Sequence, residues 1–252
     1  MDLFDLTGKK AIVTGGSGGL GLGLVEGLHE AGAEVVIVGR SAKCHELADR
    51  IGRSGAGAYG VSGDLGDRGD LDRVFAEAVA KLDGTLDILV NCAGIQRRSP
   101  SAAFPIEDWD AVIEANLTAV FSLCQLSGRL MLDKGRGKII NIASMLSFFG
   151  GYTVPAYAAS KGGVMQLTKA LANEWAGRGV NVNAIAPGYM DTPLNAALIN
   201  DPVRNRRILD RIPAGRWGTA GDMKGTVVFL ASAASDYING AIIAVDGGYL
   251  GC

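Results

Sequence analysis

Short apolar segments recur along the chain, and the mixed segments between them are long enough to form helices. Nearly continuous apolar segments of this length are typical of parallel strands that are covered on both faces. Alternation of such strands with helices predicts an α/β fold with one doubly wound, Rossmann-type parallel sheet. Seven strands are expected, at residues 11–16, 34–40, 58–64, 86–94, 138–144, 180–188 and 241–248.

The segments between the predicted strands have helical spacing. In the first of them leucines recur every four residues from Leu20, and Gly32 follows the last apolar position, as is common just after a helix C-terminus. A later helix is expected to begin at Pro155, because proline suits the first helical position. Its apolar face would hold Val164, Leu167, Leu171 and Trp175, with Gly177 near its end.

No linker, repeat or block of charge divides the chain, so residues 1–252 are expected to form a single domain. One segment, about 191–217, departs from the alternation because it is polar, interrupted by proline and without a strand pattern. We expect it to be an insertion that forms a lid over the edge of the sheet.

Composition excludes several classes of protein. Charged residues make up 20% of the chain and the net charge is −2, so no nucleic-acid partner is expected. The N-terminal residues lack the pattern of a signal peptide, and no continuous apolar run approaches the roughly 20 residues that span a bilayer. The four cysteines are scattered without metal-ligand spacing. They are expected to be free thiols in the cytoplasm, and no metal site is expected.

A glycine-rich segment, TGGSGGLG, joins the first predicted strand to the first predicted helix at residues 14–21. Glycines at such a turn let a pyrophosphate approach the backbone at the N-terminus of the helix. The same residues also fit the G-x-S-x-G nucleophile elbow of esterases, with Ser17 as the nucleophile. That alternative needs a histidine far downstream, and the two histidines of the chain are His29 and His45. A dinucleotide site is therefore expected here.

Arg40 stands at the end of the second predicted strand, where folds that bind NAD commonly carry an acidic residue for the ribose 2′-hydroxyl. An arginine attracts a 2′-phosphate, whereas an acidic residue would repel it. NADP(H) is therefore favoured over NAD(H). The alternative is that Arg40 is a solvated loop residue and that either cofactor is accepted.

Tyr157 and Lys161 lie four residues apart on a predicted helix and so share one face. The lysine ammonium is expected to lower the pKa of the tyrosine from its ordinary value of about 10, so that the phenol can exchange a proton with a substrate oxygen. Ser144, at the carboxyl end of a strand, is expected to hydrogen-bond that oxygen. Ser147 is expected to cap the next helix or to face solvent.

These motifs, with NCAG at 91–94, EANLTAVF at 114–121, PGYMDT at 187–192 and the thirteen-residue step from Ser144 to Tyr157, resemble the short-chain dehydrogenase/reductase family along essentially the whole chain. The resemblance implies an NAD(P)-dependent oxidoreductase that is usually a homotetramer. It implies a catalytic tetrad of Asn116, Ser144, Tyr157 and Lys161, in which Asn116 holds a water that relays protons through Lys161. Cys92 replaces an asparagine that is frequent in the family and is expected to affect packing.

The resemblance also implies the residues that contact the cofactor. Asp64 would contact the adenine, Gly94 would lie along the cofactor, and the segment after the sixth strand would border the nicotinamide. The expected set is Thr14, Gly15, Ser17, Gly19, Leu20, Gly21, Arg40, Asp64, Leu65, Asn91, Ala93, Gly94, Tyr157, Lys161, Pro187, Gly188, Met190 and Thr192.

A finer resemblance is to the branch of the family that acts on sugar acids of the gluconate type, and it is carried by residues 139–148, 173–190 and 208–218. An arginine fork suits the carboxylate of such a substrate. Arg97 and Arg98 follow the fourth strand, and because neighbours in an extended segment point opposite ways, one of them is expected to face the substrate. Arg98 is favoured as the arginine that faces the substrate. Ser144 and Tyr157 are the other residues that are expected to contact the substrate. The alternative is that both arginines are solvated or pair with Glu107 or Asp108.

Further candidates for the carboxylate are the arginines at 204, 206, 207 and 211, although four arginines in eight residues are more often a solvated helix face. Arg216 and Trp217 are expected to have a structural role. The function expected from all of these residues is hydride transfer between NAD(P) and a secondary alcohol or ketone of a sugar acid. The alternatives are a reductase of an uncharged polyol or a β-ketoacyl substrate, and a dinucleotide-binding sensor without turnover.

Overall fold

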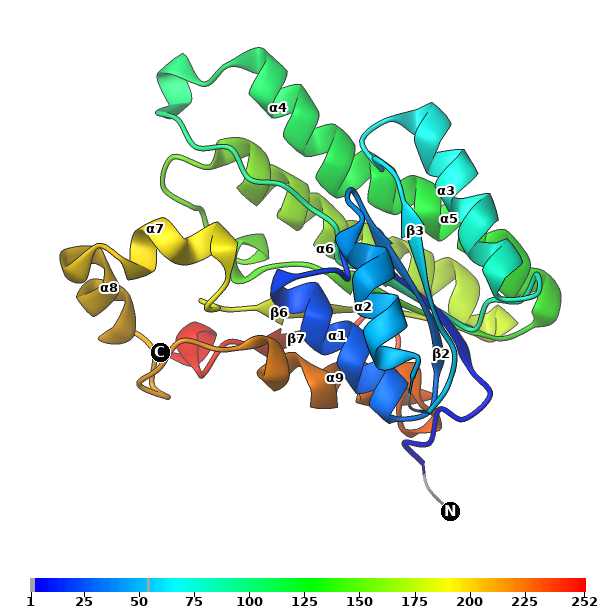
Figure 1. Ribbon diagram of the computed structural model, residues 1–252. Coiled ribbons are helices and arrows are strands. Elements are labelled where there is room, and N and C mark those ends of the chain that lie inside the picture. Colours follow the sequence, from blue (N-terminus) through cyan, green and yellow to red (C-terminus); the bar gives the residue numbers. More distant parts are fainter. Residues whose placement is uncertain (1–2, 54) are drawn as a thin grey trace.

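The computed structural model describes residues 3–53 and 55–252 and is built on one parallel sheet with the strand order β3-β2-β1-β4-β5-β6-β7 (Figure 1). The predicted fold class and the seven strands are thus confirmed. The strands are β1 (Lys10–Thr14), β2 (Glu34–Gly39), β3 (Ala58–Ser62), β4 (Ile88–Asn91), β5 (Gly137–Ile142), β6 (Val180–Pro187) and β7 (Ile242–Val245).

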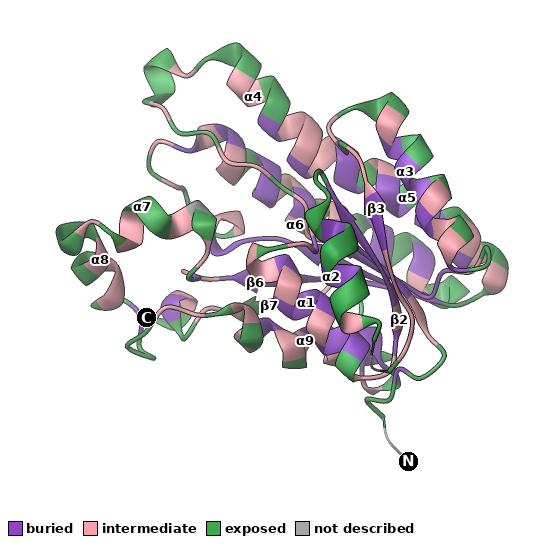
Figure 2. Cartoon of the chain, in the orientation of Figure 1, coloured by how far each residue is buried: buried purple, intermediate pink, exposed green. Residues whose placement is uncertain are grey.

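Helices cover both faces of this sheet (Figure 1). One face packs against α1 (Gly19–Glu30), α2 (Lys43–Ile51) and α9 (Lys224–Ala231). The other face packs against α3 (Arg68–Lys81), α5 (Ala119–Lys134) and α6 (Pro155–Trp175). Two buried hydrophobic clusters, one on each face, account for the continuous apolar runs in the inner strands β1, β2, β4, β5 and β6, which are buried on both sides (Figure 2).

Three further helices lie away from the sheet. The helix α4 (Ile106–Ile113) continues through the π-helical segment η2 (Glu114–Thr118) into α5. The short helices α7 (Ala196–Ile199) and α8 (Pro202–Leu209) lie in the segment after β6 and project beside the carboxyl end of the sheet (Figure 1). That segment is the one that the sequence pattern set apart at about 191–217.

The observed strands end earlier than the predicted ones. The apolar run at 86–94 forms a strand over Ile88–Asn91 alone, and the run at 11–16 forms one that ends at Thr14. The residues that follow leave the sheet at its carboxyl edge, where β1 lies between β2 and β4. Strand order reverses around β1, and this reversal opens the crevice in which ligands of such sheets bind.

The end of α6 also differs from its expected position. The helix begins at Pro155, as predicted, and ends at Trp175. A turn of 3-10 helix follows, and the residue with left-handed backbone is Gly179 (φ 83°) rather than Gly177. Glycine fits there because an added Cβ would meet the Gly135 carbonyl oxygen at 2.1 Å.

The continuous helix over 106–134 is long and apolar enough, by length and composition alone, to cross a membrane. Core helices of folded domains meet the same test. In this molecule 44% of its most apolar stretch is buried, and α5 packs against β4 and β5. The length of this helix is therefore weak evidence for a membrane span.

Candidate active site

The turn between β1 and α1 is shaped by glycines that no other residue could replace without a clash. Gly15 has a φ of 66°, and a Cβ on it would meet the Ala93 Cα at 2.8 Å. A Cβ on Gly21 would meet the Gly15 carbonyl oxygen at 2.1 Å. In contrast, Gly18 has open space around it, and as the N-cap of α1 it makes no side-chain hydrogen bond. The N–H groups at the start of α1 therefore face an open region that suits an anion.

This turn borders a cavity of about 510 Å³ along the carboxyl ends of β1, β2 and β4. Most of the predicted cofactor residues line it. They are Gly15, Ser17, Gly19, Leu20, Gly21, Arg40, Asp64, Leu65, Ala93, Gly94, Tyr157, Lys161 and Thr192. We refer to it below as the glycine-loop cavity.

Five predicted cofactor residues lie outside the wall of this cavity. Thr14 is buried, and its hydroxyl accepts hydrogen bonds from the backbone N–H groups of Cys92 and Ala93, at 3.1 and 3.2 Å. Thr14 therefore joins the turn after β1 to the turn after β4 from a buried position outside the cavity wall. The other four are Asn91 and Pro187, which end buried strands, Met190, which is buried after β6, and Gly188, which lines a second cavity described below.

Arg40 lies at one end of the glycine-loop cavity, together with a residue that the sequence analysis missed. Lys43 begins α2 and lines the same wall as Arg40. Neither side chain has an ion-pair partner within residues 3–53 and 55–252. A lysine three residues after an arginine is common on a solvated helix, so its spacing alone carried no signal; its place at the cavity comes from the turn between β2 and α2.

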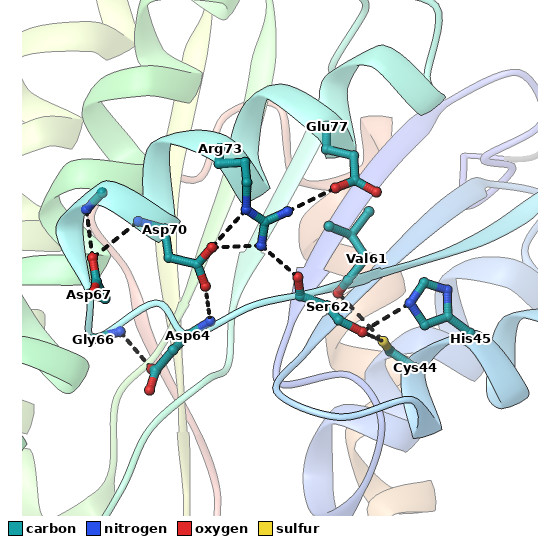
Figure 3. Close-up of polar contacts among 11 residues, drawn as sticks. Cys44, His45, Val61, Ser62, Asp64, Gly66, Asp67, Asp70, Arg73 and Glu77 are labelled. Atoms are coloured by element: carbon teal, nitrogen blue, oxygen red, sulfur yellow. Dashed lines mark hydrogen bonds and ion pairs between the residues drawn. The ribbon is translucent and has the colours of Figure 1, made fainter.

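Asp64 is held at the neighbouring wall by a network of polar contacts after β3 (Figure 3). Its carboxylate accepts a hydrogen bond from the Gly66 N–H at 2.9 Å, and its own N–H donates to the Asp70 carboxylate at 2.6 Å. Arg73 links the Asp70 carboxylate to the Ser62 carbonyl oxygen. The loop that carries Asp64 is therefore tied to both β3 and α3, which fixes the cavity wall.

Asn116 lies in the π-helical segment η2, a distortion that is frequent at functional sites. Its side-chain oxygen accepts from the Ile95 N–H at 2.8 Å, and its amide donates to the Ile95 carbonyl oxygen at 2.9 Å and to Ser160 at 3.2 Å. These bonds hold the turn after β4 against α6. A Cβ added to Gly94 would lie 3.1 Å from the Asn116 side-chain oxygen, a tight contact that would require a small shift of the amide.

Tyr157 and Lys161 share one face of α6, as the spacing predicts, and the Lys161 Nζ lies 5.7 Å from the centre of the Tyr157 ring. Lys161 is 4% exposed, and its ammonium donates to the Ile142 carbonyl oxygen at 2.6 Å. Burial lowers the pKa of Lys161 to about 8. Burial raises the pKa of Tyr157 to about 12, against an opposing hydrogen bond with Ser144.

The expectation of a lowered Tyr157 pKa is therefore wrong for this structure, because on balance the pKa is raised. Desolvation of the phenol is the largest influence, and it favours the neutral form. The phenol is accordingly a proton donor at neutral pH. Ser144 adjoins it at the end of β5, with its hydroxyl accepting from the Leu146 N–H at 3.1 Å.

Ser147 takes part in a helix cap, as one of the two expectations had it, but the capped element is the 3-10 turn Met145–Ser147 and not the next α-helix. Its hydroxyl donates to the Lys161 carbonyl oxygen at 2.7 Å and accepts from the Ser144 N–H at 3.3 Å. It thus joins the turn that carries Ser144 to the helix that carries Lys161. Cys92 lines the glycine-loop cavity and packs against one of the hydrophobic clusters, and burial raises its pKa to about 11. It is therefore an uncharged thiol.

A second cavity, of about 400 Å³, adjoins the first one. It is lined by Ser144, by the turn after it, by the segment after β6 and by α8. Tyr157 is the one described residue that lines both cavities. We refer to the second one below as the arginine cavity, because Arg98, Arg204, Arg207 and Arg211 line it.

Arg97 and Arg98 point to different surroundings. Arg97 forms an ion pair with Asp108 at 3.1 Å, which was the alternative considered for both arginines. Arg98 lines the arginine cavity, and its Nη1 donates to the Tyr152 carbonyl oxygen and to the Thr153 hydroxyl, both at 3.0 Å. Thr153 has a φ of 61°, which is an outlier for a β-branched residue. Arg98 thus holds a strained turn at the cavity wall.

The arginines of α8 and of the turn after it divide between the two expectations, the substrate site and a solvated face. Arg204 and Arg207 line the arginine cavity from α8, and Arg211 lines it from the turn after that helix. Arg206 points elsewhere and pairs with Asp210 at 2.8 Å. The pattern of the sequence could not separate these arginines, because the direction of α8 relative to the sheet depends on contacts distant in the chain.

The pair Arg216 and Trp217 has structural contacts, as expected. Arg216 forms two hydrogen bonds with the Asp222 carboxylate, at 2.8 and 2.7 Å. The Trp217 indole donates to Asn205 at 2.8 Å and packs edge-on against Tyr189, which lines the arginine cavity. Within residues 3–53 and 55–252, no cluster of three or more His, Cys, Asp or Glu residues is arranged to hold a metal ion.

This geometry defines a class of protein, and comparison with known proteins agrees with it. The model of the short chain dehydrogenase family matches residues 9–202. The chain therefore belongs to the short-chain dehydrogenase family, and the resemblance seen in its motifs is confirmed.

Relatives within the family are similar over their whole length. The 2-dehydro-3-deoxy-D-gluconate 5-dehydrogenase of Bacillus subtilis is 48% identical over 99% of this chain and 97% of its own. The gluconate 5-dehydrogenase of Gluconobacter oxydans is 42% identical over 98% of this chain and 96% of its own. The crystal structure of a gluconate 5-dehydrogenase from Burkholderia cenocepacia, in complex with NADP and tartrate, has a TM-score of 0.95 and 43% identity, over 100% of this chain and 98% of that one.

Proposed function

We propose that this protein is an oxidoreductase that transfers a hydride between NADP(H) and a secondary alcohol or ketone of a sugar acid, with NAD(H) as a weaker alternative cofactor. The observation that carries the proposal is the position of Tyr157, which lines both cavities. A group that donates or accepts a proton is thereby placed where two ligands meet. The family membership and the names of the relatives support both the reaction and the substrate class.

The residues of the glycine-loop cavity suit a dinucleotide. The uncapped start of α1 and the open space around Gly18 suit a pyrophosphate, and Arg40 and Lys43 suit a 2′-phosphate. Lys161 lies at the opposite end, beside Tyr157, where the nicotinamide ribose would be bound. When bound, the nicotinamide ring accepts or supplies the hydride.

The protein residues carry the proton. In the reducing direction the carbonyl carbon gains a hydride, and the carbonyl oxygen gains the proton of the Tyr157 phenol. In the oxidising direction the C–H bond gives up the hydride, and the hydroxyl proton returns to Tyr157. Ser144 hydrogen-bonds the same oxygen, and Lys161 stabilises the phenolate that remains after proton donation. A proton returns to Tyr157 from solvent through Lys161 and a water held at Asn116.

The arginine cavity supplies the charge that a sugar acid requires. Arg98 and Arg204 are the pair that we propose for the carboxylate, and Arg97, which is paired with Asp108, is left to a structural role. The segment 191–217, which carries α7 and α8, is proposed to be a lid over this cavity. An uncharged polyol or a β-ketoacyl group would leave these arginines without an anion.

We also infer that the protein acts in the cytoplasm as a homotetramer, without nucleic-acid or membrane partners. The net charge of −2 and the family resemblance support this. Ile106 and Phe121 are 63% and 45% exposed on the long helix 106–134, and such apolar side chains suit a contact between subunits. Light scattering coupled to size exclusion measures the mass, and a monomer at micromolar concentration would contradict the tetramer.

The test of the function is a matched comparison of substrates on the purified protein, followed by the absorbance of reduced nicotinamide. D-gluconate, 2-deoxy-D-gluconate and 2-dehydro-3-deoxy-D-gluconate are compared with neutral polyols and ketones, each with NADP(H) and NAD(H). We expect turnover of acids alone, faster with NADP(H), and a KM for the acid that rises about tenfold or more in Arg98→Ala. Equal turnover of neutral compounds would overturn the substrate class. Tight cofactor binding without any turnover would indicate a sensor.

A further inference from the structure

The arginine cavity holds more positive charge than one carboxylate needs. Arg98, Arg204, Arg207 and Arg211 all line it, and its wall contains no aspartate or glutamate. In the part of the chain that the structure describes, none of these arginines forms an ion pair, and the side chains of Arg204 and Arg207 make no hydrogen bond. One guanidinium can bind a carboxylate through two parallel hydrogen bonds, so four are in excess.

Neighbouring arginines that face away from the cavity do have acidic partners. Arg206 pairs with Asp210 on the same helix, and Arg97 pairs with Asp108 on α4. Arg204 and Arg207 are three residues apart on α8 and so share one face, whereas Arg206 is absent from the cavity wall. Arg211 lines the same cavity from the turn after the helix. The same short segment thus neutralises the outward arginine and leaves the inward ones unpaired.

The four arginines fall into two groups. Burial and the neighbouring charge of Arg204 lower the pKa of Arg98, so these two guanidiniums are close enough to repel each other. Arg207 and Arg211 have no resolved influence on Arg98. The guanidinium of Arg211 lies instead 4.4 Å from the centre of the Tyr249 ring, which is another residue of the cavity wall. An anion between Arg98 and Arg204 would therefore leave the second group unneutralised.

We infer that the natural substrate is a sugar acid with a second anionic group, a carboxylate or a phosphate, at the end of the chain distant from its first carboxylate. Arg98 and Arg204 bind one anion, and Arg207 and Arg211 bind the other. This inference rests on the proposed function, and it narrows the substrate from sugar monoacids to dianionic sugar acids. Arg207 is then a specificity-determining residue for the second anion.

The test uses three acids that share the configuration of C2 to C5 and differ at C6: D-gluconate, D-glucarate and 6-phospho-D-gluconate. Steady-state oxidation with NADP⁺ gives kcat/KM for each acid, and competition against gluconate gives an inhibition constant for any acid that is bound but not oxidised. We expect at least one of the two dianions to exceed gluconate about tenfold in kcat/KM or in affinity. Gluconate equal to or better than both dianions in each measure would overturn the inference and leave the sugar-acid function intact.

Variants of α8 show whether a direct contact is responsible. Arg207→Ala should remove the advantage of the dianion, about tenfold, and should change gluconate less than about threefold. Arg206→Ala is the matched control, because it removes the same charge from the opposite face and should change neither acid. An equal loss in both variants would overturn the inference, since it would indicate a long-range effect of net charge. If no acid of any kind is bound or oxidised, the proposed function itself fails.

Discussion

The two cavities that meet at Tyr157 are built in different ways. The glycine-loop cavity is shaped largely by backbone: Gly15 and Gly21 leave no room for a Cβ, and most of its other lining residues lie in the turns after β2, β3 and β4. The arginine cavity is shaped by side chains from the turn after β5 and from α8. The parallel sheet by itself creates the first cavity, whereas the second depends on which side chains the surrounding segments carry.

The two constructions match the two ligands, a cofactor that many enzymes share and a substrate that differs between enzymes. A cofactor that is the same in many enzymes suits a cavity made by the fold, and a substrate that varies suits a cavity made by replaceable side chains. The proton donor must serve both ligands, and Tyr157 lies where the walls meet. Substitutions in the glycine-loop cavity, in the arginine cavity and at Tyr157 should therefore impair different measurable properties.

The largest effect is expected at the shared residue. Tyr157→Phe keeps the ring and removes the hydroxyl, so kcat should fall by about 10³-fold or more while cofactor affinity stays within about twofold. Stopped-flow turnover and fluorescence titration with NADPH measure the two quantities. Substantial remaining turnover would mean that another group donates the proton.

The backbone nature of the glycine-loop cavity is tested by Gly21→Ala. The new Cβ would lie 2.1 Å from the Gly15 carbonyl oxygen, so the free energy of unfolding should fall by about 3 kcal/mol or the turn should open and lose the cofactor. Gly18→Ala is the control, because no atom lies within 4 Å of its added Cβ. Urea midpoints compare them, and equal stability of the two variants would contradict a rigid turn.

The periphery of the same cavity is tested by Arg40→Ala. Loss of a charged contact to the 2′-phosphate should raise the KM for NADP(H) about tenfold or more and leave that for NAD(H) within about threefold. Arg50→Ala is the matched control, because Arg50 is exposed on α2 outside the cavity wall. An equal rise in KM for both cofactors would mean that Arg40 does not contact the 2′-phosphate and is a solvated loop residue.

The smallest effect is expected for the stability of Lys161→Met. Burial lowers the pKa of Lys161 to about 8 from 10.5, so the unfolded chain binds more protons between these values and the wild-type protein gains stability as pH rises through them. Below pH 8 the buried charge costs stability in full. Removing it should therefore stabilise the protein at pH 7 by roughly 1–2 kcal/mol, because loss of the bond to Ile142 offsets part of the gain.

The measurement is urea unfolding of Lys161→Met and wild-type protein at pH 7 and at pH 10.5. The gain in the free energy of unfolding of Lys161→Met over wild type should shrink at pH 10.5. At that pH Lys161 of the wild-type protein is neutral in the folded state and half-neutral in the unfolded chain. A variant that is less stable than wild type at pH 7 would mean that the hydrogen bond to Ile142 outweighs the desolvation of the ammonium.

Local patterns were sufficient for the strands, the glycine turn and the Tyr157–Lys161 pair, because each depends on residues close together in the chain. Local patterns were insufficient where the properties of a residue depend on contacts with other segments of the chain. The pKa of Tyr157 depends on burial under the turns of other strands, and the hydroxyl of Ser147 bonds to a helix that begins eight residues later. Lys43 had no signal in the sequence, and the arginines at 204, 206, 207 and 211 were candidates that the sequence could not tell apart.

The sequence by itself determined the α/β fold, the dinucleotide turn and the identity of the groups that can carry a proton, because apolar period, glycine spacing and side-chain chemistry are local properties. The tertiary structure alone decided which arginines share a cavity and which are neutralised. That choice depends on how α8 and the turn after β4 are oriented against the sheet, and this orientation is set by packing between segments more than a hundred residues apart.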